Sequence, residues 1–180
     1  MDFADLVRRW NDGDEMAGNA LFSEIDAELN AIAAARLRKE ANCSLSTGDL
    51  VNEAVLKLSR LEEIKFEGRP HILALVSRLM MQILIDAARK RASGKNHVSR
   101  VTLTTNSAYW EKPVDLVALD IAMGELKHVD PERSRIVEMR FFGGMSSAEI
   151  GEVLGVSEKT VKRRWASTRA WLADRLGNPA

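Results

Sequence analysis

The residues best suited to do chemistry are cations close to the C-terminal end of the chain. Lys159, Lys162 and Arg163 follow Ser157, a residue type that commonly caps the N-terminus of a helix. At helical spacing they lie away from an apolar stripe, which consists of Val161, Trp165, Thr168 and Leu172. Long cations on the outer side of a helix can reach phosphates and base edges in a DNA groove. The pattern therefore predicts a DNA-contacting helix, with an ordinary solvated basic surface as the alternative.

The segment before these cations has the spacing of a helix-turn-helix, from Ser147 to Arg164. Ser146 and Glu149 form an S-x-x-E capping box that opens a short helix. Gly151 allows the second helix to cross closely over the first, and Gly155 can adopt the positive φ of the turn. The predicted small core of this motif consists of Ile150, Leu154, Val156 and Val161. This agreement of cap, turn and core favours DNA binding over a merely solvated surface.

A second polar stripe follows the long apolar segment that begins at Pro70, a residue suited to a first helical turn. His71, Arg78, Gln82 and Arg89 are spaced seven, four and seven residues apart, so they share one flank of a helix. Taken alone, such a stripe is more typical of a solvated helix surface than of a binding site. We expect the two preceding helices to enclose the apolar side of this helix.

The elements that position these residues are predicted to be helices throughout. Helix signals include a cap at Ser46 and the Asp130-Pro131 pair, whose helix should end at Gly143-Gly144. Residues 93–113 show no helical period and are rich in Gly, Asn, Ser and Thr. The sequence therefore predicts an all-α fold, with a helical domain over residues 1–92, a flexible linker over 93–113, and a helix-turn-helix domain over 114–180.

Composition excludes several classes of function. The 180-residue chain has 26 Lys and Arg against 26 Asp and Glu, and 46 % hydrophobic residues, as in a soluble globular protein. One cysteine, Cys43, cannot form an internal disulfide, and three scattered histidines have no metal-ligand spacing. There is no nucleophile elbow or phosphate-binding glycine loop. We predict a non-enzyme with no catalytic residue, metal, cofactor or small-molecule substrate.

The N-terminus lacks the basic and apolar regions of a signal peptide. The longest apolar stretch, Ile72–Ala88, is interrupted by polar residues and is too short to span a bilayer. We therefore predict a cytoplasmic protein without membrane insertion.

Three segments carry a family resemblance. They are DLVNEAVLKL (Asp49–Leu58), ILIDAARKR (Ile83–Arg91) and VDPERSRIVEMRFFGGMSSAEIGEVLGVSEKTVKRRWASTRAWL (Val129–Leu172). In this order and with this linker, the chain resembles bacterial sigma factors of the sigma-70 family, extracytoplasmic-function (ECF) type. The GDEMAGNALF segment (Gly13–Phe22) is similar to the start of region two in such factors.

The resemblance implies a subunit that binds core RNA polymerase and directs it to promoter DNA for transcription initiation. It assigns polymerase binding to Asp49, Asn52, Glu53 and Leu56. It assigns contacts with the minus-ten element to Arg78, Gln82 and Arg89, together with the loop from Arg60 to His71. It assigns the minus-thirty-five element to the recognition helix, with Ser157, Glu158, Lys159, Thr160, Lys162, Arg163 and Arg164. An anti-sigma factor is a further partner that the resemblance allows.

The chain departs from the family pattern near the start of its third helix. Many relatives have an aromatic residue there and Asn where this chain has Gln82, whereas here the segment is His71-Ile72-Leu73. Two other hypotheses remain. A helix-turn-helix repressor or activator would bind DNA without polymerase, usually as a dimer on a palindrome. An enzyme is the third, and the missing motifs argue against it.

Overall fold

Helices account for nearly all of the chain that the computed structural model describes, which comprises residues 2–37, 45–61, 66–93, 100–102 and 113–177. The N-terminal block contains α1 (Phe3–Asn11), α2 (Glu15–Leu37), α3 (Thr47–Ser59) and α4 (Arg69–Ala92). The C-terminal block contains α5 (Leu116–Val129), α6 (Pro131–Val137), the π-helical η1 (Glu138–Phe142), α7 (Ser147–Leu154) and α8 (Glu158–Arg175). The predicted all-α class is confirmed.

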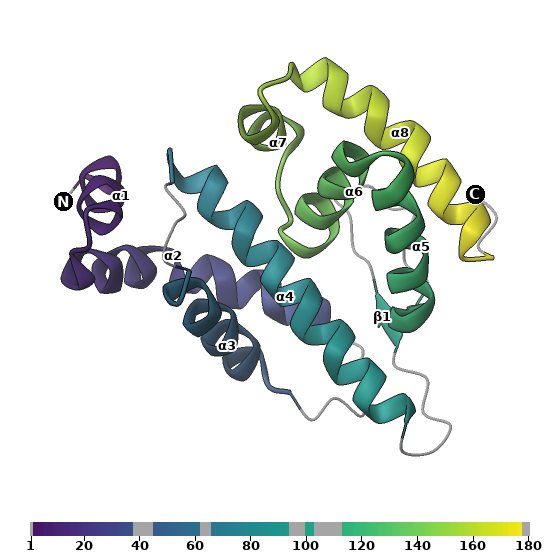
Figure 1. Cartoon of the computed structure of the whole chain (residues 1–180), viewed down its shortest axis with the longest axis horizontal. Helices are drawn as coiled ribbons and strands as arrows, with labels where there is room; N and C mark the ends of the chain where they lie inside the picture. The colour runs from purple at the N-terminus through teal and green to yellow at the C-terminus, as the bar shows by residue number, and fades with distance from the viewer. Residues whose placement is uncertain (1, 38–44, 62–65, 94–99, 103–112, 178–180) are drawn as a thin grey trace.

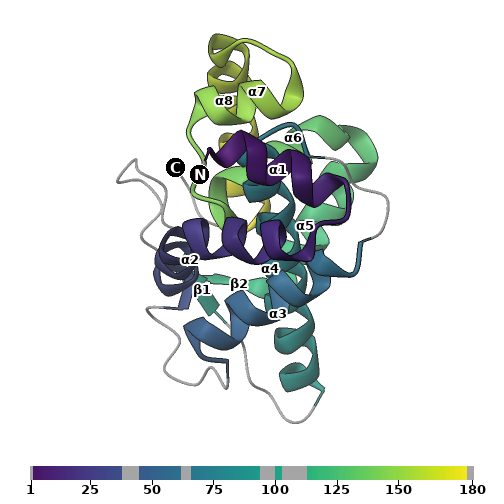
Figure 2. The same ribbon diagram turned by 90° about the vertical axis from the view of Figure 1, so that its left-hand side faces the viewer.

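Two short strands accompany the helices. β1 (Arg100–Thr102) pairs antiparallel with β2 (Pro113–Asp115), with Val101 opposite Val114. The pair lies beside α2 (Figure 2). It brings together two ends of the predicted linker, whose residues 94–99 and 103–112 lie outside the described residues, as does Cys43. The domain boundaries and the flexibility of the linker stay predictions.

Local signals set the helix boundaries. The Ser46 hydroxyl accepts a hydrogen bond from the backbone N–H of Asp49 at 3.1 Å, and the Asp49 carboxylate accepts one from the N–H of Ser46 at 3.0 Å. This capping box satisfies donors that the first helical turn leaves unpaired. Asp130 caps α6 by accepting from the N–H of Arg133 at 3.1 Å, and Pro131 occupies the first turn. These starts agree with the sequence patterns.

α4 is the central element, because it is buried from two sides. It packs against α3 on one side and against α5, η1 and α7 on the other (Figure 1). This differs from the expectation that the two preceding helices enclose it, and it explains why few of its positions are polar. Among the described residues, α4 is long and apolar enough to cross a membrane by length and composition, but 61 % of that stretch is buried inside the protein.

The contact between α4 and the end of η1 is close. Ser77 of α4 is 1 % exposed, and a Cβ atom added to Gly143 would lie 2.1 Å from its Oγ. No side chain fits in that space without movement, so a glycine stands where the two blocks meet. The buried apolar residues of both blocks consequently form one continuous cluster.

The N-terminal helix fixes the segment that leads into α4. The Asn11 side chain donates to the carbonyl of Phe66 at 2.9 Å and accepts from its N–H at 3.1 Å. Trp10 stacks on the Phe66 ring, with centroids 4.9 Å apart and planes 5° from parallel. The start of α4 is therefore held by residues from the first helix of the chain.

Glu138, in η1, is a carboxylate placed against α4. Its burial raises its pKa above the ordinary value, and this effect outweighs the attraction of Arg78, Lys127 and Arg135, which lowers the pKa. His71 lines a small cleft together with Glu138. A raised pKa means that the native protein holds this proton more tightly than the unfolded chain.

Replacing Glu138 with Gln should therefore stabilise the protein in a pH-dependent way. The native carboxyl contributes stability below its unfolded pKa, and this contribution is lost as the pH rises through the folded value. The free energy of unfolding by urea, measured from pH 4 to pH 7, should shift in favour of the Gln variant as the pH rises. Glu24→Gln on α2 controls for loss of a charge, and a difference independent of pH would contradict the assignment.

Candidate nucleic-acid interface

The helix-turn-helix forms as its sequence pattern predicts. Ser146 and Glu149 make the capping box, and Gly155 ends α7 in the left-handed region with φ +66°. A Cβ added to Gly151 would lie 2.6 Å from the carbonyl oxygen of Val156, so the close crossing requires glycine. Ser157 then caps α8 by accepting from the N–H of Thr160 at 3.2 Å. The turn is therefore fixed by backbone geometry.

The inner side of α8 is buried at the positions that the apolar stripe predicts. Val161, Trp165, Thr168 and Leu172 are all buried, as is Ile150 of α7, whereas Leu154 and Val156 are partly exposed. The Trp165 ring meets Phe141 edge to face at a centroid distance of 5.0 Å. Packing on η1 and α6 thus sets the direction in which the outer side of α8 points.

Arg140 joins η1 to the start of α7. Its guanidinium lies 5.8 Å from the Trp165 ring centroid and donates to the carbonyl of Met145 at 3.2 Å and to the Ser147 hydroxyl at 3.3 Å. Desolvation lowers the pKa of Arg140. The side chain nevertheless stays charged, because the ordinary pKa of arginine lies far above neutral pH. This residue, which the sequence patterns did not single out, holds the helix-turn-helix on its support.

The outer side of α8 presents most of the predicted minus-thirty-five residues to solvent. Lys159, Lys162 and Arg163 are exposed, and we call these three cations the recognition face. Lys162 also pairs with Glu158 at 2.7 Å. Arg164 points elsewhere, because it pairs with Glu132 of α6 at 2.5 Å and its side chain is 29 % exposed. Ser157 and Thr160 are engaged in the cap, with their hydroxyl oxygens 3.0 Å apart.

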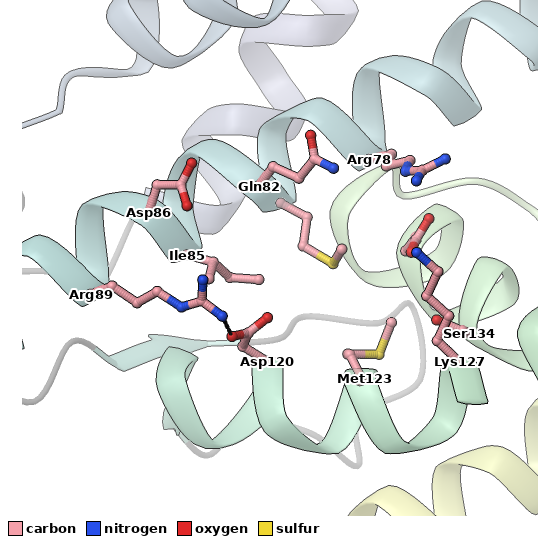
Figure 3. A pocket seen from close by; sticks show the side chains of 12 residues that line it. Arg78, Gln82, Ile85, Asp86, Arg89, Asp120, Met123, Lys127 and Ser134 are labelled. Atoms are coloured by element: carbon pink, nitrogen blue, oxygen red, sulfur yellow. Dashed lines mark hydrogen bonds and ion pairs between the residues drawn. The ribbon is translucent and has the colours of Figure 1, made fainter. Parts of the chain in front are cut away.

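The stripe on α4 lies along the junction of the two blocks. Arg78, Gln82 and Arg89 are exposed and line one cleft of about 450 Å³ (Figure 3). His71 lies apart in a second cleft of about 200 Å³, which Arg78 also lines. Its Nε2 atom is 3.6 Å from a carboxylate oxygen of Glu67. We call His71, Arg78, Gln82 and Arg89 the minus-ten face.

The opposite wall of the larger cleft comes from the C-terminal block. Arg89 forms an ion pair with Asp120 of α5, which Figure 3 shows as a dashed line. Lys127 of α5 and Glu138 of η1 also line this cleft.

The predicted polymerase-binding residues share one side of α3. Asp49, Asn52, Glu53 and Leu56 are all exposed at spacings of three, one and three residues, and we call them the docking face. Hydrogen bonds from the Ser46 side chain and backbone hold the pKa of Asp49 below its usual range. Glu53 lies 3.8 Å from Lys57, and Leu56 is 55 % exposed. The surface is thus acidic with an exposed apolar residue.

Comparison with known proteins identifies the family. The model of the family described as ECF sigma factor matches residues 1–178. The chain belongs to the ECF sigma factor family. Such a sigma factor binds core RNA polymerase and promoter DNA and acts in transcription initiation and its regulation. The family is one of non-catalytic regulators. A comparison with curated proteins finds no match.

The sequence patterns did not identify two carboxylates that lie in the larger cleft of this sigma factor. Asp120 and Glu138 lie 31 and 60 residues after Arg89 and Arg78, the arginines that they face. The residue spacing within their own helices does not indicate these partners. Only the packing of α5 and η1 on α4 brings them to the minus-ten face.

Substitution of Gly151 by Ala should destabilise the helix-turn-helix. Its Cβ would collide with the Val156 carbonyl, and forced movement of a packed backbone costs about 1 to 3 kcal/mol. Gly124 in α5 is the matched control, because a Cβ there meets nothing within 4 Å. Gly124→Ala should gain about 0.5 to 1 kcal/mol from helix propensity. Urea unfolding measures both, and equal shifts would contradict the crossing geometry.

Proposed function

We propose that this sigma factor recognises the minus-thirty-five element with α8, contacts the minus-ten element with α4, and docks on core polymerase through α3. The observation that carries the proposal is the exposed recognition face on α8, a helix whose inner side is buried against the rest of the C-terminal block. A solvent-facing helix with three long cations can enter a major groove, and the exposed Ala166 and Ala170 behind them do not block approach.

Within α8, the contacts divide by chemistry. Arg163 is exposed and forms no ion pair with another residue that the structure describes, so its guanidinium can meet guanine edges or phosphates. Arg164 is held by Glu132 and serves better to fix α8 on α6 than to meet bases. Ser157 and Thr160 cap the helix, so their contribution is to aim its N-terminus at the DNA backbone.

On α4, the proposed minus-ten contacts come from Arg78, Gln82 and Arg89. The Gln82 amide can donate to and accept from a base edge, and the arginines can pair with phosphates. His71 is less suited to this role, since it lies in the smaller cleft against Glu67. The start of α4 has no aromatic residue on which an unpaired base could stack, and such stacking is worth about 1 to 3 kcal/mol per base.

The docking face fits a protein partner better than nucleic acid. Asp49 and Glu53 would repel phosphates, whereas an exposed Leu56 beside carboxylates suits a polymerase surface that is basic around an apolar centre. We propose the cytoplasm, where transcription takes place, as the site of action. An anti-sigma factor would act by covering one of these three surfaces.

Transcription in vitro with core polymerase and genomic promoters tests the proposed function. The chain should add initiation that core polymerase lacks, and Arg163→Ala should weaken promoter binding by about 1 to 3 kcal/mol if it contacts a base. If Arg163 meets only phosphate, the slope of affinity against salt should fall by about one ion instead.

Arg8→Ala is the matched control for Arg163→Ala. Arg8 is an exposed arginine on α1, far from α8 in sequence, and its removal changes the net charge equally. Promoter binding that responds equally to both variants would overturn the groove assignment. Operator binding by the free chain as a dimer, with no added initiation, would instead favour a repressor or activator.

Glu53→Arg should abolish co-purification with core polymerase, because it reverses a charge in the centre of the docking face. Glu53 is exposed, so the free energy of unfolding should change little. Glu24→Arg, an exposed position on α2, makes the same charge change outside this face. Retention of polymerase binding by Glu53→Arg, or equal loss with Glu24→Arg, would refute the docking assignment.

A further inference from the structure

We propose that Asn11, in the last turn of α1, is a positioning residue for recognition of the minus-ten element. It holds the backbone of Phe66 and thereby sets where the first turns of α4 lie. This inference rests on the proposed role of α4 in minus-ten recognition. Asn11 acts on the proposed DNA contacts through Phe66 and does not itself touch DNA.

The Asn11 amide pairs with both backbone polar groups of Phe66. Its Nδ2 donates to the Phe66 carbonyl at 2.9 Å, and its Oδ1 accepts from the Phe66 N–H at 3.1 Å. Phe66 is 7 % exposed, and buried backbone groups need hydrogen-bond partners. An amide that binds both groups of one residue fixes the position and the rotation of that part of the backbone. The contact joins residues 55 positions apart in the sequence.

Trp10, the neighbouring residue on α1, holds the Phe66 side chain by ring stacking. The indole itself is fixed by α2. It meets the Phe22 ring edge to face at a centroid distance of 5.1 Å. A Cβ atom added to Gly18 would lie 2.8 Å from the Trp10 Cδ1, so the indole lies directly against the backbone of α2. Phe66 is therefore attached to a support that is packed in its own right.

The start of α4 depends on such an external contact because it has no side-chain cap. Its N-cap residue is Gly68, which makes no side-chain hydrogen bond. A side-chain cap typically contributes about 1 kcal/mol to a helix start. Every other α-helix in the described part of the chain begins at a side chain that accepts a backbone N–H, and these are Asp2, Asp14, Ser46, Asp115, Asp130, Ser146 and Ser157.

The first turn of α4 is set instead by Pro70 and by contacts from α1 and α2. Arg69 pairs with Glu28 of α2 at 2.5 Å, and Phe66, three residues earlier, is held by α1. The N–H groups of an uncapped first turn have no partner within the helix, so such a turn frays easily. Asn11 therefore supplies from a distant segment the restraint that a local cap supplies elsewhere.

Phe66 connects this restraint to the minus-ten face. Its side chain lines the smaller cleft together with His71 and Arg78, two members of that face. Groups that recognise a ligand must be held within about 0.5 Å of their working geometry. Release of Phe66 from Asn11 would let the first turn of α4 shift, and the wall of the cleft beside Arg78 would shift with it. The loss should therefore fall on selectivity for the minus-ten sequence.

Asn11 is a better residue to change than Trp10, whose truncation would remove packing against Phe22. Asn30 on α2 is the matched control. Its Nδ2 donates to the carbonyl of Asp26, four residues earlier in the same helix, at 2.9 Å. Asn11 and Asn30 are both half-buried, so their alanine variants remove the same atoms at similar exposure.

Initiation with core polymerase tests the inference on an active genomic promoter and on derivatives with one base pair replaced in the minus-ten or the minus-thirty-five element. The ratio of initiation on the original promoter to that on a derivative measures selectivity. Asn11→Ala should lower the minus-ten ratio by about fivefold, the order expected for one or two lost hydrogen bonds. It should leave the minus-thirty-five ratio unchanged, and Asn30→Ala should change neither.

These ratios separate a positioning role from a merely structural one. A variant that only folds less well lowers initiation on every promoter equally, so both ratios stay as they are. An unchanged minus-ten ratio in Asn11→Ala would overturn the inference, and so would an equal fall in both ratios or an equal effect of Asn30→Ala. If the unsubstituted chain shows no minus-ten selectivity, the proposed role of α4 fails, and the inference fails with it.

Asn11→Asp keeps the inference testable if Asn11→Ala does not fold. The new side chain has nearly the same shape, and its carboxylate can accept from the Phe66 N–H but cannot donate to the Phe66 carbonyl. It should lower the minus-ten ratio by about twofold or more, in line with the loss of one hydrogen bond. Asn30→Asp makes the same charge change on α2. Equal minus-ten ratios for these two variants would overturn the inference.

Discussion

The burial of α4 from two sides is the constraint on which the rest of the structure depends. A helix with apolar residues around most of its circumference cannot be covered by one neighbour. α3 covers one side, and α5, η1 and α7 cover the other. Among the polar positions left on α4, Arg78, Gln82 and Arg89 line a single cleft at the junction of the two blocks. The burial that stabilises α4 therefore also places the side chains that we propose to contact DNA.

The helix-turn-helix follows a different rule, since its geometry is encoded locally. The capping box at Ser146, the left-handed Gly155 and the close approach at Gly151 each involve residues within a few positions of one another. Such signals are legible in sequence because the interacting groups are neighbours in the chain. The buried stripe of α8 and its exposed cations could be predicted for the same reason, as could the helix starts at Ser46 and Asp130.

The contacts that sequence patterns could not provide join distant segments. Arg164 belongs by position to the recognition helix, yet Glu132, 32 residues earlier, holds it. The sequence pattern also does not predict the π-helical turn at the end of the helix that begins at Asp130-Pro131, although the predicted end at Gly143-Gly144 is correct. That wider turn brings Gly143 onto Ser77 and Glu138 toward Arg78. Periodicity predicts which side of a helix is polar, but not which charge will face it.

Pairing across the blocks gives the zero net charge of the chain a physical meaning. A DNA-binding protein with exposed cations on two helices would bind any duplex at low salt through phosphate contacts alone. Here Asp120 pairs with Arg89 and Glu138 lies near Arg78 within the folded chain, while the recognition face stays exposed to solvent, with only Lys162 paired, to Glu158. Average charge therefore says little about the nucleic-acid affinity of such a protein, because carboxylates of the C-terminal block face the cations of α4 and leave those of α8 exposed to solvent.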